Sequence, residues 1–377
     1  MVVSGKNISA QDLIYYMEQI APPKLAEAWD NSGWQVGYPA NCVQKVLLTL
    51  DITPAVVKEA IKKNVQLIVS HHPLLFNSVK SIRFDDPTGN MIISLIKANI
   101  GLYSAHTTLD SALGGVSDVL TDLLKLTACQ VLEPVRQEQL LKLVVFVPQT
   151  HAEAMRQALG GAGAGHIGAY SHCTYNLQGT GTFLPLPGTN PFIGKINQLE
   201  QVEETRIETI ITGDKISQVL EKMIAVHPYE EVAYDLYPLA NSYATQGLGR
   251  IGQVFPELTL IQLARQVKKA LVADNLRYGG DPEKIIRRVA VCGGSGGDLW
   301  QTAKQKGADV FITGDIRHHT ALDMVAAGLS FIDAGHFITE RVVLPILKER
   351  LNTVLAQDGV TVDIELANSD VEPWLNL

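Results

Sequence analysis

Six side chains of the types that bind divalent metal ions each lie shortly after a short apolar run of the chain. They are His71, His72, His106, Asp110, His336 and Glu340. Imidazole nitrogens and carboxylate oxygens suit Zn, Mn, Fe, Co or Ni ions, and no CxxC pair in the chain competes for them. Together the six groups are enough to hold two divalent ions and to leave positions open for water.

The spacing of these residues strengthens the metal hypothesis. His106 precedes Asp110 by four residues, and His336 precedes Glu340 by the same interval. If the chain turns helical at those points, each pair presents a nitrogen and an oxygen on one side. The side chains of the adjacent His71 and His72 point in different directions and can reach different ions. Each of these three motifs, the adjacent histidines and the two histidine-carboxylate pairs, is alone more often an ordinary loop or core feature. Their occurrence at three strand ends favours a metal site.

The elements that must position these residues alternate between strand and helix. Such alternation is typical of parallel β-α-β units, whose ligands collect at the carboxyl ends of the strands. A helix capped by Ser9 is expected to precede them and to end before Pro22. The first series is predicted to have strands at 46–50, 67–69 and 101–104 and helices at 55–63 and 89–98, and the second to have strands at 289–292, 310–312 and 329–332 and helices at 298–306 and 320–327.

The two series can be superimposed along the sequence. An interval of 243 residues separates Val46 from Val289 and also Leu67 from Val310. Asn64 and Gly307 fall at the same relative place, where a helix is expected to end in the left-handed conformation. The pattern predicts an internal duplication. Chance similarity is the alternative, because the spacings of β-α-β units vary little.

The stretch between the two series has a different order of predicted strands and helices. Its elements do not follow the order of parallel crossovers, which favours a small ferredoxin-like α+β sheet inserted into the larger domain. The predicted fold is α/β: a duplicated core domain with parallel-rich sheets, formed by residues 1–128 and 241–377, and an insert at 129–240. The insert is predicted to have strands at 141–147, 170–177, 181–184, 203–211 and 231–237 and helices at 152–158 and 216–225.

The composition indicates a compact chain that works with ions and small molecules. Of its 377 residues, 46% are hydrophobic and 19% are charged, which excludes disorder as the main state. The 39 acidic residues outnumber 31 basic ones, and no basic run with interleaved aromatics occurs, so nucleic-acid binding is not expected. Four well-separated cysteines, the lack of a secretory leader and the lack of a membrane-spanning apolar run predict a reduced cytoplasmic protein.

Four segments around the six residues carry a resemblance to a known family. They are Ser70–Phe76, Tyr103–Asp110, Thr313–Asp315 and Asp333–Glu340. They resemble motifs of the Nif-three-like family, also called GTP cyclohydrolase type-two homologues. Within the insert, residues 165–170, 192–194 and 227–235 are similar to the insert of longer bacterial members. The resemblance implies a dinuclear metal core, an insert like PII-type signalling proteins, and assembly as a toroidal homohexamer.

The resemblance also implies how the ligands divide between two ions. His71 and Asp110 would hold one ion. His72 and His336 would hold the other, and Glu340 would bridge both. Two divalent ions per chain are therefore expected, with Zn first and Mn, Fe, Co or Ni as alternatives.

The activity that this arrangement implies is hydrolysis. His106 is not a ligand in the family pattern, so we expect it to orient Asp110 or to exchange protons with a bound water as a catalytic residue. Paired ions activate water, which suits cleavage of a phosphoester or opening of a purine ring. We therefore expect a hydrolase acting on a nucleotide-like or phosphorylated small molecule. The alternative is a metal-binding regulatory or carrier protein without turnover, whose insert senses a ligand or partner.

Several other polar segments have both a functional and a structural interpretation. Gly293–Gly297 lies between a predicted strand and helix, where it either contacts phosphate or makes a tight turn. His318–His319 either lines the cleft at the strand ends that carry the candidate ligands or starts a solvated helix. Asp30–Asn31 either orients that cleft or caps a loop. For His172–Cys173 a structural strand is favoured over a zinc site, and for His227 a turn is favoured over metal binding.

Overall fold

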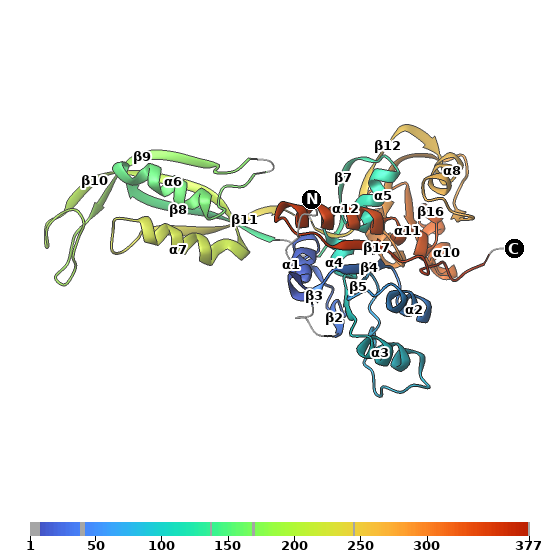
Figure 1. The fold of residues 1–377 in the computed structure, drawn as a ribbon. Helices are drawn as coiled ribbons and strands as arrows, with labels where there is room; N and C mark the ends of the chain where they lie inside the picture. The colour runs from blue at the N-terminus through green and yellow to red at the C-terminus, as the bar shows by residue number, and fades with distance from the viewer. Residues whose placement is uncertain (1–7, 38–41, 136–137, 168–169, 244–245, 376–377) are drawn as a thin grey trace. The chain divides into compact units, whose positions relative to one another are not determined.

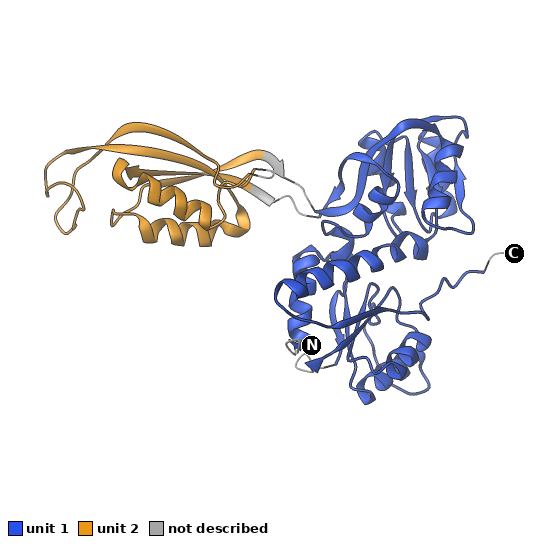
Figure 2. Cartoon of the chain, turned by 45° about the horizontal axis from the view of Figure 1, so that its top comes forward, with its two compact units in different colours: residues 1–136, 245–377 blue, residues 137–244 orange. Residues whose placement is uncertain are grey.

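The computed structural model describes residues 8–37, 42–135, 138–167, 170–243 and 246–375. Gly168 and Ala169, in the middle of the segment 165–170, lie outside the described residues. The chain divides into two compact units, coloured separately in Figure 2: unit 1 comprises residues 1–136 and 245–377, and unit 2 comprises residues 137–244. No helix in the described ranges is long and apolar enough to cross a lipid bilayer.

Unit 1 is built around a five-stranded and a six-stranded sheet (Figure 1). The five-stranded sheet has the order β17-β4-β5-β6-β2, and β2 alone runs antiparallel to its neighbour. Its strands are β2 (Gly33–Val36), β4 (Lys45–Thr49), β5 (Leu67–Ser70), β6 (Gly101–Ser104) and β17 (Asp363–Leu366), and a separate two-stranded sheet pairs β1 (Ile8–Ser9) with β3 (Cys42–Val43).

The six-stranded sheet has the order β13-β16-β15-β14-β12-β7. Its strands β14, β15 and β16 are parallel, whereas β13, β12 and β7 pair antiparallel. Unit 1 is therefore a mixed α/β structure, and its sheets combine parallel with antiparallel pairing. The strands of this sheet are β7 (Thr127–Pro134), β12 (Gly247–Thr259), β13 (Arg277–Gly279), β14 (Ile285–Val291), β15 (Val310–Thr313) and β16 (Ser330–Asp333).

Helices connect and cover these strands. The first helix begins as the sequence predicts, because the Ser9 side chain accepts from the Asp12 backbone N–H and the Asp12 carboxylate accepts from Ser9. The helices of unit 1 are α1 (Ala10–Ile20), α2 (Pro54–Lys62), α3 (Pro87–Lys97), α4 (Thr107–Ser111), α5 (Val116–Leu123), α8 (Leu260–Ala270), α9 (Trp300–Gln305), α10 (His318–Ala326), α11 (His336–Arg341) and α12 (Val343–Gln357), with short 3-10 turns at Pro23–Leu25 and Gly297–Leu299.

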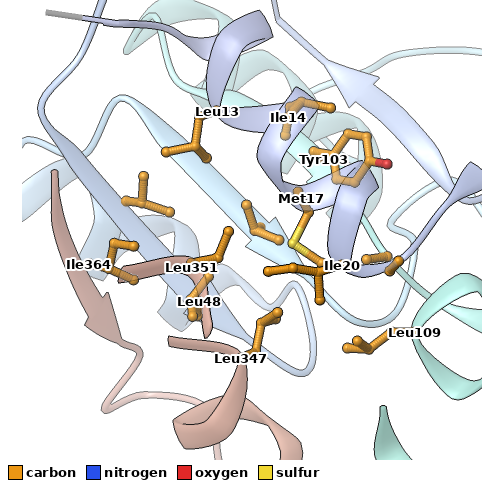
Figure 3. Close-up of a cluster of buried hydrophobic side chains, with 14 of the residues drawn as sticks. Leu13, Ile14, Met17, Ile20, Leu48, Tyr103, Leu109, Leu347, Leu351 and Ile364 are labelled. Carbon is orange, nitrogen blue, oxygen red and sulfur yellow. The ribbon is translucent and has the colours of Figure 1, made fainter. Parts of the chain in front are cut away.

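A buried cluster joins α1, the first sheet and α12 (Figure 3). Met17 of α1, Leu48 of β4 and Leu351 of α12 are all fully buried in it. Each such side chain stabilises the fold by about 1.5–3 kcal/mol relative to exposure. Phe337 of α11 belongs to the same cluster, so the helix that carries His336 and Glu340 is anchored by core packing.

The two β-α-β series have the same register. Val46 pairs with Leu67 in the first sheet, and Val289 pairs with Val310 in the second, both in parallel. Asn64 and Gly307 end the connecting helices with φ angles of 53° and 78°. The left-handed helix ends predicted for these two residues are confirmed, and the strand pairing agrees with the 243-residue interval.

Unit 2 contains one four-stranded antiparallel sheet with the order β11-β8-β10-β9. Its chain order is strand, helix, strand, strand, helix, strand, which is that of the ferredoxin-like motif. The closer likeness to PII-type signalling proteins stays a prediction. The elements are β8 (Glu138–Pro148), α6 (Ala152–Gly161), β9 (Thr174–Phe183), β10 (Glu200–Thr212), α7 (Ile216–Val226) and β11 (Tyr234–Tyr243), with 3-10 turns at Gln149–His151 and Gly213–Lys215.

Two details of the predicted insert differ from the structure. One strand, β9, replaces the strands predicted at 170–177 and 181–184, because Gly179 and Gly181 stay in register opposite Glu204 and Val202 of β10. It begins only at Thr174, so the strand predicted for His172–Cys173 is wrong. The boundaries also shift. Residues 129–134 belong to unit 1 because β7 pairs with β12, while β11 runs on to residue 243 opposite β8.

Candidate metal centre

The adjacent histidines His71 and His72 extend directly from the carboxyl end of β5. The His71 backbone N–H donates to the Thr49 carbonyl at 3.0 Å, and that of His72 donates to the Leu50 carbonyl at 2.9 Å. The Ser70 hydroxyl donates to the carbonyl of His72 at 2.8 Å. Strand pairing therefore continues past β5 and fixes the backbone of both histidines.

The two carboxylates of the predicted ligand set come from short helices that begin where β6 and β16 end. Helix α4 starts one residue after His106 and places Asp110 in its first turn. Helix α11 starts at His336 and places Glu340 one turn later. The His336 Nε2 lies 3.1 Å from the Glu340 Oε2, so the four-residue spacing puts both groups on one side of the helix, as predicted.

Three donor atoms form a first group around His71. The His71 Nε2 lies 3.5 Å from the Asp110 Oδ1 and 3.7 Å from the Glu340 Oε1. The His71 Nδ1 lies 3.1 Å from the Ala105 carbonyl oxygen, which only accepts, so Nδ1 carries the proton. In the neutral ring this leaves the lone pair on Nε2, the nitrogen that faces the two carboxylates.

A second group forms around the other oxygen of Glu340. Its Oε2 lies 3.1 Å from the Nε2 atoms of both His72 and His336, and those two nitrogens are 3.3 Å apart. The outer nitrogens are held by carboxylates: the His72 Nδ1 lies 2.9 Å from Asp51, and the His336 Nδ1 lies 2.7 Å from Asp315. A carboxylate on the outer nitrogen is typical of metal-binding histidines, because it fixes the ring and raises its basicity.

The chemistry of the donor atoms fits a divalent ion. The His71 Nε2 and the Asp110 Oδ1 are buried and have no hydrogen-bond partner, although they lie 3.5 Å from each other. Buried polar atoms without partners are costly. Each group of three donor atoms lies within 4.8 Å. The predicted ligands His71, His72, Asp110, His336 and Glu340 are therefore brought together, in an arrangement able to hold metal.

The charges of the site are strongly coupled. Burial and the nearby Glu340 raise the pKa of Asp110. Burial alone would also raise the pKa of Glu340, but the surrounding histidines outweigh it and hold that pKa well below the usual range. Burial would lower the pKa of His72 and His336, yet the carboxylates beside them raise these values to about 10 and about 9. In the metal-free protein the rings of His72 and His336 therefore carry protons, at positions where the carboxylates would also stabilise a metal cation.

His106 lies beside the five residues and is held by Asp30. The His106 Nδ1 lies 2.7 Å from the Asp30 Oδ1, while the Ser32 and Thr107 hydroxyls donate to the other Asp30 oxygen. Burial tends to raise the pKa of Asp30, but these hydrogen bonds lower it overall. One nitrogen of His106 lies within 4.8 Å of nitrogens of His71 and His72. Asp30 therefore orients His106, the cleft role that the sequence left open.

The glycine-rich loop Gly293–Gly297 packs against the Glu340 carboxylate of the cluster. The Gly294 N–H donates to the Thr339 hydroxyl and the Gly296 N–H to the Thr313 hydroxyl, each at 2.9 Å. Because these amides bond within the fold, the tight-turn interpretation is favoured over phosphate contact. Gly294 has a φ of 62°, and a Cβ there would lie 1.9 Å from the Glu340 Oε1. Only glycine lets this loop approach the carboxylate.

The remaining polar segments belong to neither donor group. His318 and His319 are exposed at the start of α10. In His227 the Nε2 lies 2.9 Å from the Phe146 carbonyl and the Nδ1 accepts the Tyr229 N–H, which confirms the predicted turn. His172–Cys173 joins no group of possible metal ligands among the described residues.

Sequence reasoning missed one supporting residue and left another without a role. Asp51 follows β4, next to β5 in the sheet, so its place at a parallel strand end was the available signal. Asp315 lies in a quoted motif, and its φ of 55° is unusual for a residue other than glycine. Both carboxylates contact the outer nitrogens of predicted ligands.

Fold and site together define a mixed α/β protein with a histidine and carboxylate cluster that can hold metal at its strand ends. The chain belongs to the Duf34/NIF3 (NGG1p interacting factor 3) family, which it matches over residues 8–373. This confirms the resemblance seen in the motifs.

Relatives match along nearly the whole chain. Proteins of Halalkalibacterium halodurans and Bacillus subtilis, both named GTP cyclohydrolase 1 type 2 homolog, are 45% and 41% identical over 98% of this chain and 99% of their own. The crystal structure of a Bacillus cereus protein related to NIF3 superimposes with a TM-score of 0.86 at 43% identity, covering 99% of this chain and 100% of that one.

Proposed function

We propose that the cluster binds two divalent ions and that the protein is a metal-dependent hydrolase acting on a nucleotide-like or phosphorylated small molecule. The observation that carries the proposal is the sharing of Glu340 between two groups of donors. Its Oε1 faces His71, while its Oε2 faces His72 and His336. A carboxylate that offers one oxygen to each group is suited to lie between two ions.

The charge of the site supports a role for the ions in binding an anionic substrate. Among the described residues, the cluster histidines pair with four carboxylates, Asp51, Asp110, Asp315 and Glu340. No lysine or arginine takes part in these described pairs. In the metal-free site these carboxylates offset the positive charge of the protonated histidines, so divalent cations would supply the charge that attracts phosphate.

The ions would lower the pKa of bound water and so supply the nucleophile. The protein groups then have distinct tasks. Asp51 and Asp315 hold His72 and His336 in the orientation that aims Nε2 inward. Asp30 accepts the Nδ1–H of His106, which leaves the Nε2 of His106 free to take a proton and return it to a leaving group. The relatives' printed name, GTP cyclohydrolase 1 type 2 homolog, agrees with attack on a nucleotide.

The test combines metal content with turnover. Protein purified without chelator is expected to contain about two divalent ions per chain by elemental analysis, as the two donor groups require. Nucleotides and phosphomonoesters are then assayed after reconstitution with Zn, Mn, Fe, Co or Ni. Glu340→Gln is expected to abolish turnover, and His319→Ala, which alters an exposed histidine outside the donor groups, is the matched control.

The outcomes separate the enzyme from a metal carrier. Two tightly held, exchangeable ions without turnover on any substrate would favour the carrier. One ion or none, unchanged in His72→Ala, would contradict the dinuclear proposal itself.

A further inference from the structure

Two exposed aromatic side chains stand beside the candidate metal centre. Trp29 is 59% exposed and Phe76 is 50% exposed, although both rings are large and apolar. Their ring centroids are 6.1 Å apart, and the ring planes meet at 58°. Neither side chain has a part in the hydrolytic chemistry proposed above.

His106 links this pair to the metal-binding residues. Its ring centroid lies 5.8 Å from that of Trp29 and 6.3 Å from that of Phe76. The same ring lies 5.3 Å from His71 and 5.4 Å from His72. A ligand that contacts both the aromatic pair and the ions therefore needs to span little more than one aromatic ring.

The two loops that carry the aromatic pair are tied to each other. The Asn31 side-chain amide donates to the Leu75 carbonyl at 2.6 Å, and the Leu75 N–H donates to the Gln35 side chain at 3.1 Å. The Gln35 amide in turn donates to the Asn31 carbonyl at 2.7 Å. This network fixes Trp29 and Phe76 relative to each other before any ligand binds, which lowers the entropy cost of binding.

We propose that Trp29 and Phe76 form a stacking subsite for a planar heteroaromatic ring, such as a nucleobase, of the substrate processed at the metal centre. The inference rests on the proposed function, and it narrows the substrate from any phosphorylated small molecule to one that carries such a ring. Aromatic faces attract the π-face of any base, so the subsite selects a ring without reading its identity. The phosphate or reacting atom lies on the ions, next to His106.

Equilibrium binding to the metal-loaded full-length protein tests the subsite. The probes are the four ribonucleoside monophosphates and ribose 5-phosphate, which has the same sugar and phosphate but no base. At least one nucleotide is expected to bind about tenfold tighter than ribose 5-phosphate. Trp29→Leu and Phe76→Leu are expected to remove this advantage, whereas Trp29→Tyr keeps most of it.

Matched controls exclude a general effect of losing an exposed aromatic. Trp374→Leu and Phe84→Leu alter side chains that are 76% and 64% exposed and have no ring contact with His106 among the contacts described. Both are expected to bind like the wild type. Metal content and circular dichroism confirm that Trp29→Leu and Phe76→Leu still fold and hold ions.

The two proposals fail in different ways. If no nucleotide binds more tightly than ribose 5-phosphate while all the ligands need metal, the stacking subsite is overturned and the centre stands. If chelation of the metal leaves every affinity unchanged, the metal-centre proposal fails. If Trp29→Leu weakens both classes of ligand equally, or changes the mass of the particle in light scattering instead, the pair serves packing or assembly and the subsite is overturned.

Discussion

The Nε2 atoms of His72 and His336 lie 3.3 Å apart, although 264 residues separate the two histidines in the chain. His72 follows β5 in the five-stranded sheet, and His336 follows β16 in the six-stranded sheet. The second donor group therefore exists only when both halves of unit 1 are folded. Two unprotonated nitrogens at this distance repel each other, so a proton or a metal ion between them stabilises the arrangement.

Removal of one of these nitrogens is expected to empty one position and to spare the other. We predict that His336→Ala lowers the metal content from about two ions per chain to about one, because His71 still faces both Asp110 and the Oε1 of Glu340. Elemental analysis after dialysis against metal-free buffer measures this. Retention of both ions would show that His336 is not a ligand, and His318→Ala is the control.

The outer carboxylates are expected to tune affinity without being ligands. Asp51→Asn removes the negative charge beside the His72 Nδ1 but keeps the shape of the side chain. Loss of such a partner commonly lowers metal affinity by about 10- to 100-fold. Competition with a fluorescent chelator measures the change, with the number of ions at saturating metal unchanged. An unaltered affinity would assign Asp51 a structural role only.

Metal binding is expected to release protons. Burial opposes the charged form of His72 and His336, but the adjacent carboxylates raise their pKa values to about 10 and about 9. At pH 7 the metal-free rings are protonated, and an imidazolium cannot bind metal. Affinity should therefore rise from pH 7 towards pH 9. Calorimetry in buffers of different ionisation enthalpy should show net proton release at pH 7, and a pH-independent affinity would contradict the assignment.

A higher pH is expected to destabilise the metal-free chain, although it strengthens metal binding, because of the same raised pKa values of His72 and His336. A raised histidine pKa stabilises the folded state most fully below the ordinary value of 6.5. The contribution is lost as the pH rises through about 9 for His336 and about 10 for His72. Chelator-treated protein should therefore unfold more easily at pH 10 than at pH 7, and added metal should reduce the difference.

The glycine loop is expected to tolerate a methyl group at one position and not at another. Gly294→Ala would place a Cβ 1.9 Å from the Glu340 Oε1 at a φ of 62°, whereas the Cβ of Gly297→Ala would meet no atom within 4 Å. We expect Gly294→Ala to lose at least one ion and about 1–3 kcal/mol of stability, and Gly297→Ala to match the wild type. Elemental analysis and thermal unfolding distinguish them, and equal behaviour would contradict this account of the loop.

The sequence predicts the parts of this structure that depend on local chain pattern. The pairing partners Val46 and Leu67 belong to apolar runs that a buried parallel strand requires, and Asn64 marks the helix end between them. The predicted ligands follow such runs directly, so their meeting at strand ends could be anticipated. The assignment of ligands to individual ions came from family resemblance and remains a proposal.

Features that depend on long-range pairing were harder to predict. Gly179 and Gly181 look like turn residues, but pairing with β10 keeps them in one strand. The first half of β7 has exposed side chains, so no long apolar run marks the strand that pairs residues 127–134 with β12. Asp51 escaped notice because a carboxylate after a strand is common, and only the folded sheet shows that it lies beside His72.

An ion pair between a buried arginine and a part-buried aspartate is expected to hold the two segments of unit 1 together. Arg250 of β12 is 3% exposed, and its guanidinium donates to both carboxylate oxygens of Asp118 in α5, at 2.5 and 2.9 Å. Removal of Arg250 leaves the part-buried Asp118 carboxylate without its ion-pair partner, which costs up to about 3–5 kcal/mol. Arg250→Met should therefore lower the free energy of unfolding by about that amount.

The exposed ion pair of Arg287 and Glu257 provides the control for this prediction. Its side chains are 67% and 50% exposed, and such pairs contribute about 0–1 kcal/mol. Chemical denaturation of Arg250→Met and Arg287→Met, at equal metal saturation, compares the two sites. Equal losses would mean that the Arg250 pair is no more important than a surface contact. If Asp118→Asn restores part of the stability of Arg250→Met, the cost lies in the unpaired carboxylate, because the double variant buries no uncompensated charge.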